Sequence, residues 1–233
     1  MNPLWNQIAA RAGVTLDEHQ SARISRYLDL LMEANATMNL TRITDRAQAE
    51  VQHVGDSLTV LEHLPKGAHR LADVGSGGGV PGIVLAIARA DAQVTLIEST
   101  KKKAAFLLRT AEALELTNVT VLPLRAEEAG QSDVREKFDV AVARAVATID
   151  WLAEWCLPLV KKGGKVLLMK GPRHAEELPA AQRAIKAAGG GAAVIHPVEL
   201  PGATGLVIVE IAKIGRTDKR LPREATIAKG KAL

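Results

Sequence analysis

The stretch that decides how this chain folds is Asp73-Val74-Gly75-Ser76-Gly77-Gly78-Gly79-Val80-Pro81-Gly82. Residues 71–74, which are apolar apart from Asp73, predict a strand that runs directly into the glycines. Glycine lets a backbone turn tightly and approach a ligand without an intervening side chain. Because proline suits the first turn of a helix, Pro81 predicts a helix over residues 81–90. A glycine loop between a strand and a helix marks the crevice in which open α/β sheets bind their ligands.

Short apolar strands alternate with helices through the rest of the chain. Besides 71–74, strands are expected at residues 94–97, 119–122, 138–142, 166–169, 193–198 and 205–211. Helices are expected at residues 101–116, 151–160 and 175–188. This alternation predicts an α/β fold, in which a Rossmann-like, seven-stranded and mostly parallel sheet is covered by helices on both faces.

The first 66 residues predict a helical extension that precedes the sheet. Apolar residues recur at helical spacing from Leu16 to Leu31, and Asp17 stands in a stretch typical of a capped helix start. A second helix is expected over residues 46–64, and a short loop around Asn39 separates the two. We therefore divide the chain into a helical extension packed on the core (1–66), a sheet domain (67–213) and a basic C-terminal tail (214–233).

The composition is that of an ordinary folded protein. Of 233 residues, 47% are hydrophobic and 24% are charged, which argues against disorder. No run approaches the roughly 18 apolar residues that a membrane span needs, and residues 1–11 lack the pattern of a signal peptide. The single cysteine, Cys156, stands in an apolar run and is interpreted as buried rather than reactive. We expect a cytoplasmic protein without a bound metal.

The positive charge is concentrated at the C-terminus. The formal net charge is +4, and residues 213–233 carry seven basic and two acidic side chains (+5), which leaves −1 for residues 1–212. The basic residues are Lys213, Arg216, Lys219, Arg220, Arg223, Lys229 and Lys231. Two interpretations stay open: an arm that touches a polyanion, or a solvated, frayed end. With 3% aromatic residues, a surface that stacks many bases is not expected.

The glycines allow two registers, which predict different ligands. Gly77-x-Gly79-x-x-Gly82 matches a dinucleotide fingerprint, but a pyrophosphate needs a free helix N-terminus and the proline indicates that the helix has already begun. The register Asp73-x-Gly75-x-Gly77-x-Gly79 resembles the cofactor loop of class I methyltransferases. The ligand of those proteins carries an amino acid end, whose ammonium an acid such as Asp73 could hold, commonly through water.

Residues after the second and third strands support the methyltransferase register. Glu98 follows the strand at 94–97 and is placed to accept both hydroxyl hydrogens of a ribose. Ser99 and Thr100 come next, so Glu98 could instead serve the start of the following helix. The glycine loop one strand earlier favours the ribose role. Arg125-Ala126-Glu127-Glu128 follows the third strand, where such folds contact adenine with a backbone amide and a nearby acid.

The segment after the fourth strand, where the methyl acceptor is usually handled, reads Ala143-Arg144-Ala145-Val146-Ala147. It lacks the Asn/Asp-Pro-Pro-aromatic stretch of enzymes that methylate exocyclic amino groups, and Cys156 is not where a pyrimidine C5 enzyme needs its nucleophile. These absences favour an acceptor that is already nucleophilic, such as guanine N7, which bears no proton at neutral pH. Arg144 could donate to guanine O6, to phosphate or on the cofactor side, and Lys170 after the fifth strand is a similar candidate.

Taken in order, these motifs resemble the ribosomal small-subunit methyltransferase G family over nearly the whole chain. The motifs are Asn39-Leu40-Thr41, His53-x-x-Asp56-Ser57-Leu58, the glycine loop with Pro81-Gly82, Glu98 followed by Lys102-Lys103, Arg125-Ala126-Glu127, Ala143-Arg144-Ala145-Val146, Gly163-Gly164, Lys170-Gly171 and the basic tail. The chain departs from the family's pattern at Val80, where a larger apolar residue is common. It also departs at Leu221, since an aromatic residue commonly precedes the proline there.

The resemblance implies a class I, S-adenosylmethionine-dependent enzyme that methylates N7 of a guanine (guanine-527) in the 530 loop of 16S ribosomal RNA. The cofactor contacts that it implies are Gly75, Gly77, Val80, Glu98, Ala126, Glu127 and Arg144, beside Asp73 and Gly79 of the loop. The candidates for substrate contact or active-site support are Asn39, His53, Asp56, Arg125, Arg144 and Lys170. The implied partner is 16S rRNA, free or within the small subunit or an assembly intermediate, and we expect a monomer.

The spacing of two of these candidates leaves their role open. His53 and Asp56 stand about one turn apart on an expected helix and could face the crevice together. They could equally form a hydrogen-bonded pair that fixes the extension on the domain.

Three other functions stay open from sequence. A nicotinamide-dependent oxidoreductase would use the shifted glycine register, but no hydride-transfer acid is evident. A non-catalytic RNA- or ribosome-binding protein would keep the fold without turnover. This alternative is disfavoured by the intact glycine loop, Glu98 and Arg144. The basic tail disfavours methylation of a protein or a small molecule.

Overall fold

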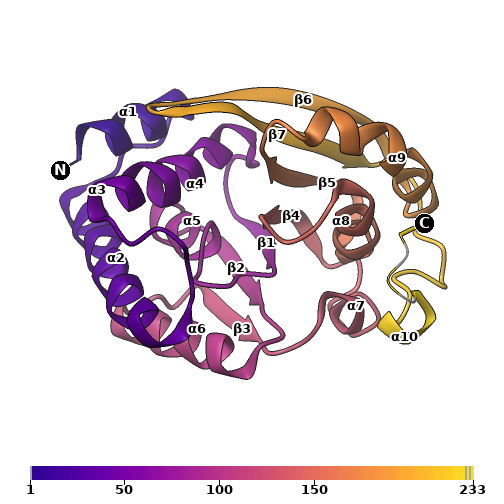
Figure 1. The fold of residues 1–233 in the computed structure, drawn as a ribbon, viewed down its shortest axis with the longest axis horizontal. Coiled ribbons are helices and arrows are strands. Elements are labelled where there is room, and N and C mark those ends of the chain that lie inside the picture. The colour runs from indigo at the N-terminus through magenta and orange to yellow at the C-terminus, as the bar shows by residue number, and fades with distance from the viewer. Residues whose placement is uncertain (1, 229, 231) are drawn as a thin grey trace.

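The computed structural model describes residues 2–228, 230 and 232–233 (Figure 1). Its strands are β1 (His69–Val74), β2 (Ala92–Ile97), β3 (Val119–Leu122), β4 (Phe138–Arg144), β5 (Val160–Lys170), β6 (Gly190–Leu200) and β7 (Ala203–Lys213). Its α-helices are α1 (Pro3–Arg11), α2 (Glu18–Met38), α3 (Arg46–Ala49), α4 (Asp56–Thr59), α5 (Gly82–Ala88), α6 (Lys101–Ala113), α7 (Ala126–Ala129), α8 (Ile149–Cys156), α9 (His174–Ala187) and α10 (Ala225–Ala228). A π-helical turn, η1 (Glu50–Gly55), and two 3₁₀ turns, η2 (Val60–His63) and η3 (Leu157–Leu159), complete the order. None of the helices in the described part of the chain is long and apolar enough to cross a membrane.

The seven strands form one sheet in the order β3-β2-β1-β4-β5-β7-β6. Strand β7 runs antiparallel to β5 and β6, and the other neighbouring pairs are parallel, which confirms the predicted mostly parallel sheet. Val74 at the end of β1 pairs with Ile97 at the end of β2, and β4 lies in register on the other side of β1. The carboxyl ends of these three strands therefore meet at one edge of the sheet, where the glycine loop follows β1, Glu98 follows β2 and Arg144 ends β4.

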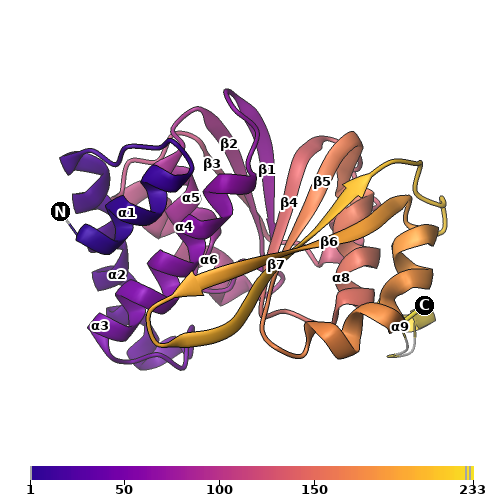
Figure 2. The same cartoon turned by 90° about the horizontal axis from the view of Figure 1, so that it is seen from above.

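Alternate residues of the strands enter two hydrophobic cores, one on each face of the sheet. Val140 and Val142 of β4 belong to the first core, with α5, α6 and the N-terminal helices. Ala141 and Ala143 belong to the second, with α8 and α9. Figure 2 shows the two helical layers on either side of the strands. Burial on both faces explains why the central strands are continuous apolar runs rather than alternating patterns.

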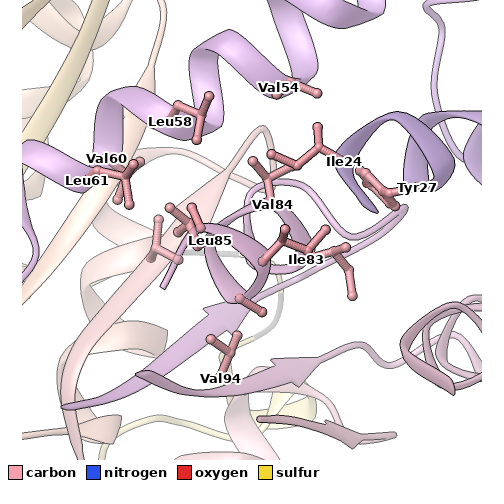
Figure 3. Close-up of a cluster of buried hydrophobic side chains, with 14 of the residues drawn as sticks. Ile24, Tyr27, Val54, Leu58, Val60, Leu61, Ile83, Val84, Leu85 and Val94 are labelled. Carbon is pink, nitrogen blue, oxygen red and sulfur yellow. The ribbon is translucent and has the colours of Figure 1, made fainter. Parts of the chain in front are cut away.

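The N-terminal helices pack on α5 through buried apolar side chains. Helix α2 begins with a capping box, in which Asp17 accepts from the Gln20 N–H and the Gln20 side chain accepts from the Asp17 N–H. The predicted capped start is therefore confirmed. Ile24 of α2, Leu58 of α4 and Val84 of α5 converge above β2 (Figure 3). The helix expected over 46–64 is present as the run α3-η1-α4-η2, although the sequence pattern does not predict its π-helical turn.

The β6–β7 hairpin is longer than its apolar patches predict. Its two strands have 11 residues each, and the hairpin reaches beyond the rest of the sheet to the N-terminal helices, where its turn lies beside α1 (Figures 1 and 2). Near the turn, Leu200 is buried in the same core as Trp5 and Ile8 of α1. Strand β6 alternates between half-buried and exposed residues, and the first residues of β7 are half-buried or exposed, so these parts of the hairpin carry little apolar signal.

Part of the C-terminal tail packs on the second core. Lys213, which was counted with the basic residues of the tail, belongs to β7 instead. Lys213 ends β7, is 1% exposed, and its Nζ donates to the Leu157 and Ala188 carbonyls, so it does not face a polyanion. Leu221 is buried in the second core. Arg223 forms a 2.6 Å ion pair with Glu154, which is fully buried. The frayed-end interpretation is therefore wrong up to Arg223, and Lys229 and Lys231 lie outside the described residues.

Candidate active site

A cleft of about 1340 Å³ opens at the carboxyl ends of β1, β2 and β4. One wall is the glycine loop, and the opposite wall consists of residues from the end of α2 and the loop that follows, between 31 and 44. The predicted site residues that line the cleft are Asn39, His53, Gly75, Gly77, Val80, Glu98 and Arg144. The N-terminal extension thus completes a cleft that the sheet alone would leave open on one side.

The glycine loop is fastened to the neighbouring strand by its own backbone. The N–H groups of Gly75 and Ser76 donate to the carbonyl of Ile97 at 2.9 and 3.1 Å. Gly75 has a φ of 74°, and a Cβ added there would lie 2.6 Å from Cγ2 of Val146. A Cβ on Gly77 would meet only the carbonyl oxygen of Gly75, at 3.8 Å. The backbone at Gly77 is therefore open to a ligand, as the methyltransferase register requires.

Glu98 supports both the loop and the next helix. Its Oε2 accepts from the Gly77 N–H at 2.9 Å, and its Oε1 accepts from the Thr100 N–H at 2.7 Å, directly before α6. The helix-start role that sequence left open is thus present. A carboxylate has about four acceptor positions, so two remain on a residue that also lines the cleft. The ribose contact stays a prediction.

Asp73 lies behind the loop rather than in the cleft. It is 1% exposed, and its Oδ2 accepts from the Gly82 N–H at 3.0 Å, while Oδ1 is buried without a hydrogen-bond partner in the described structure. Burial raises the pKa of Asp73 to about 7. Helix α5 begins at Gly82 and not at Pro81, and a Cβ on Gly82 would lie 2.5 Å from Asp73. Because a carboxylate already occupies this helix start, it has no room for a pyrophosphate, and the dinucleotide register is wrong.

Arg144, at the end of β4, joins the sheet to the N-terminal extension. Its Nη1 donates to the carbonyl of Gln52 at 2.6 Å and to Oδ2 of Asp56 at 2.9 Å. Its Nη2 bonds Nδ1 of His53 at 2.8 Å. Within the described residues, His53 and Asp56 are not hydrogen-bonded to each other. Both bond Arg144, so the predicted pair is linked through the guanidinium. These bonds use three of the five N–H groups of the guanidinium.

This network fixes the protonation state of His53. Arginine only donates, so Nδ1 of His53 must accept, and Nε2 must carry the proton that bonds Oγ1 of Thr41 at 2.8 Å. Burial and the neighbouring Arg144 lower the pKa of His53 to about 4. Burial raises the pKa of Asp56, and Arg144 opposes that rise. His53 is therefore neutral and fully bonded at pH 7, and it is unsuited to act as a general base.

Thr41 and Tyr27 belong to the site, although neither is among the predicted functional residues. Oγ1 of Thr41 accepts from His53 and from the Ile43 N–H at 3.0 Å, so its own hydrogen is left to donate into the cleft that Thr41 lines. The buried hydroxyl of Tyr27 donates to the carbonyl of Gly78 at 2.8 Å and ties α2 to the glycine loop. Asn39, with a φ of 51°, ends α2 in the left-handed conformation. The Asn39-Leu40-Thr41 motif is the sequence signal for Thr41.

The remaining predicted residues do not line the cleft. Nζ of Lys170 pairs with Glu177 at 2.7 Å and donates to the carbonyl of Ala147 at 2.9 Å, so it braces the segment after Arg144. Arg125 precedes α7, and its side chain is 62% exposed. The other two positions after β3, Ala126 and Glu127, begin α7, also outside the cleft. Gly79 is buried and has a φ of 99°, and a Cβ there would lie 2.7 Å from Ile83, which indicates a packing role.

The sheet order, its single antiparallel strand and the glycine cleft after β1 define a class I S-adenosylmethionine-dependent methyltransferase. A solved SAM-dependent methyltransferase from Aquifex aeolicus shares this fold with a TM-score of 0.55 and 15% identity, over 76% of this chain and 97% of that one. A ribosomal protein L11 methylase from Lactobacillus delbrueckii subsp. bulgaricus has a TM-score of 0.52 and 18% identity, over 70% and 79% of the two chains.

Sequence comparison narrows the class to one family. Residues 20–200 match the family model for rRNA small subunit methyltransferase G. The ribosomal RNA small subunit methyltransferase G of Sorangium cellulosum is 46% identical over 216 residues, 91% of this chain and 88% of that protein. The same-named protein of Chloroflexus aggregans is 43% identical over 212 residues, 91% and 89% of the two chains. The chain belongs to the rRNA small subunit methyltransferase G family.

Proposed function

We propose that this protein transfers a methyl group from S-adenosylmethionine to N7 of guanine-527 in the 530 loop of 16S ribosomal RNA. The observation that carries the proposal is the network around Arg144, which places a rigid arginine in the cleft beside a histidine and an aspartate that are already bonded to it. Curated relatives named for methylation of small-subunit rRNA support the substrate.

The cofactor end of the cleft fits S-adenosylmethionine. Glu98 keeps two acceptor positions for the ribose, and the backbone at Gly77 is open. Asp73 lies behind the loop, and its buried Oδ1, which has no partner in the described structure, would accept from the cofactor's ammonium through water. Val80 would lie against the cofactor, and Ala126 and Glu127 would approach the adenine from α7. When bound, the cofactor supplies an electrophilic methyl group. The protein's own task is to hold the acceptor in line with that methyl and to exclude water.

Guanine N7 suits these side chains because it needs no proton removed. His53 has both ring nitrogens bonded, and Asp56 is paired with Arg144, so neither is free to take a proton. Arg144 has two N–H groups left after its bonds in the described structure, which can hold guanine O6 or a phosphate. A donor aimed at N7 itself would block the reaction, so we assign Arg144 to acceptor atoms beside it. Asn39 would contact the substrate, and Lys170 and Arg125 would support the site.

We further assign a monomer that works in the cytoplasm on 16S rRNA, on the small subunit or on an assembly intermediate. Arg42 and Lys103 line the cleft with Arg144, and Arg216, Lys219 and Arg220 are exposed on the tail. These cations would neutralise phosphates of the RNA, which makes binding salt-dependent. Within this assignment, residues 1–66 form the substrate-side wall, 67–213 the methyltransferase domain and 214–233 the basic tail.

The test is transfer of labelled methyl from S-adenosylmethionine to small subunits and to 16S rRNA that lack the modification, followed by cleavage mapping of N7-methylguanine. We expect label at one guanine of the 530 loop, its loss in Arg144→Ala, and its retention in His19→Gln, which changes an exposed side chain outside the cleft and the tail. Cofactor binding without label on either RNA substrate would contradict the acceptor assignment. Absence of cofactor binding would contradict the assignment of the glycine loop.

A further inference from the structure

Two histidines and a glutamate converge at a second place, outside the cleft. His63 is the last residue of η2, His196 lies in β6 and Glu210 lies in β7. One ligand atom from each lies within 4.8 Å of the other two. Nε2 of His196 is 3.4 Å and Nδ1 of His63 is 4.0 Å from the same oxygen, Oε2 of Glu210. None of the three lines the cleft, so the substrate site does not explain their convergence.

The strand register explains how the sheet brings them together. Glu210 pairs with Val194, and His196 stands two residues further along β6, so Glu210 and His196 point to the same face. Leu167 pairs with Glu210 and belongs to the core of the N-terminal helices. The shared face is therefore the one that η2 covers, and His63 reaches it from above. Its ring stacks on His196 with the centroids 4.3 Å apart.

The donor set and its spacing fit a divalent transition metal. Two imidazoles and one carboxylate suit zinc, which binds nitrogen and oxygen at about 2.0–2.2 Å, so that tetrahedral donors lie about 3.3 Å apart. The separation of His196 and Glu210 already has this value, and the 4.0 Å from His63 to Glu210 would have to shorten by less than an ångström. Nε2 of His196 is buried and has no hydrogen-bond partner in the described structure. A buried nitrogen that faces a carboxylate without bonding it calls for an explanation, and a cation bound between the two groups provides one.

We propose that His63, His196 and Glu210 form a binding site for one zinc ion, with water as the fourth ligand. The sequence alone led us to expect no metal, because the three residues are far apart in the chain and match no ligand-spacing motif. The ion joins η2, the end of the N-terminal extension, to the two strands at the edge of the sheet. It therefore fixes the extension, which forms one wall of the cleft, without touching the cleft itself.

Lys165 of β5 contacts the same glutamate, and replacing it gives a second test of the proposed zinc site. Its Nζ lies 3.2 Å from Oε2 of Glu210, so its positive charge competes with a metal ion for the same oxygen. Replacing it by methionine removes the charge and keeps the apolar stem. The Lys165→Met variant is therefore expected to bind zinc at least as tightly as the wild type.

The experiment is a zinc titration of the full-length protein, free of any histidine tag and pretreated with a chelator. His196→Gln and Glu210→Gln remove one ligand each, and His19→Gln, which changes an exposed histidine elsewhere, is the matched control. Circular dichroism and methyl transfer to small subunits report whether each variant is folded. Cobalt(II), which absorbs visibly in tetrahedral sites, gives a second readout.

We expect one zinc per wild-type chain and visible cobalt bands, with binding at least about tenfold weaker in His196→Gln and Glu210→Gln and unchanged in His19→Gln. Unsaturable zinc binding would overturn the proposal. So would equal affinity in the wild type and the folded ligand variants, or a Lys165→Met variant as weak as His196→Gln. Because the titration needs neither cofactor nor RNA, its failure is distinct from a failure of the proposed methyltransferase activity.

Discussion

The free energy of unfolding is expected to fall less in acid when His53 is replaced by glutamine than it does in the wild type. In the folded protein, His53 accepts from Arg144 and donates to Thr41, which holds the imidazole neutral. Burial lowers its pKa to about 4, against an ordinary value of 6.5. Since the folded pKa is the lower one, the unfolded chain takes up the proton first as the pH falls. Stability contributed by His53 is therefore present above pH 6.5 and is lost between about pH 6.5 and pH 4.

The size of the effect follows from the two pKa values. Their difference corresponds to about 3 kcal/mol of unfolding free energy when fully expressed, and to about 2 kcal/mol between pH 8 and pH 5. Asp73 acts in the opposite sense, because burial raises its pKa to about 7. Its contribution is present below its unfolded pKa and is lost as the pH rises to about 7. The two groups overlap in the wild-type profile, so only the difference between wild type and variant isolates His53.

The assay is urea unfolding of the wild type, His53→Gln and His19→Gln at pH 8 and pH 5. Glutamine can offer one acceptor and one donor, and any constant loss of stability cancels in the comparison across pH. Between the two pH values the wild type should lose about 2 kcal/mol more than His53→Gln. The exposed control His19→Gln should follow the wild type. Equal losses in the wild type and His53→Gln would refute the buried neutral imidazole.

Three further substitutions test the cleft and the tail. Gly75→Ala should weaken S-adenosylmethionine binding in calorimetry by about tenfold or more, because of its φ of 74° and the 2.6 Å approach to Val146. Val146→Ala should restore part of that affinity, and no recovery would contradict the steric cause. Arg144→Lys cannot make all three bonds of the guanidinium, so methyl transfer should fall about 100-fold in a folded protein, whereas an unchanged rate would disprove its role. Arg223→Ala leaves Glu154 buried and unpaired, which should lower Tm by about 10 °C, and a shift of only a degree or two would show that the tail does not matter for stability.

Local patterns were sufficient to predict the fold and the residues that line the glycine-loop side of the cleft, Gly75, Gly77, Val80 and Glu98. The turn after β1 requires glycine at Gly75 and Gly77, because both have a positive φ. Glu98 follows the neighbouring strand and accepts from the Gly77 N–H, so the strand-loop-helix pattern brings it to the loop. Cys156 is buried as expected, and burial raises its thiol pKa. These features depend on short stretches of chain and on the register of parallel strands, and both can be predicted from sequence patterns.

The features that were missed depend on contacts between distant segments. Lys213 counts as a tail charge in the sequence, yet the carbonyls that bury it belong to Leu157 and Ala188. Asp73 also accepts from the Gly82 N–H at the start of α5, which its place in the glycine register does not predict. Lys170 was a candidate for substrate contact or active-site support, and its ion pair with Glu177 of α9 favours support. No local pattern identifies such partners, because tertiary packing selects them.

The position of the β6–β7 hairpin turn beside α1 has a consequence for how the chain folds during translation. Leu200, near the hairpin turn, belongs to the same buried core as α1 and lies beside Ile8 next to Gly55. At about 5–20 residues per second, a ribosome delivers that leucine on the order of ten seconds or more after α1. Throughout this interval the first helix lacks part of its cover. The nascent protein therefore completes the packing of its first helix only after the β6–β7 hairpin has been synthesised.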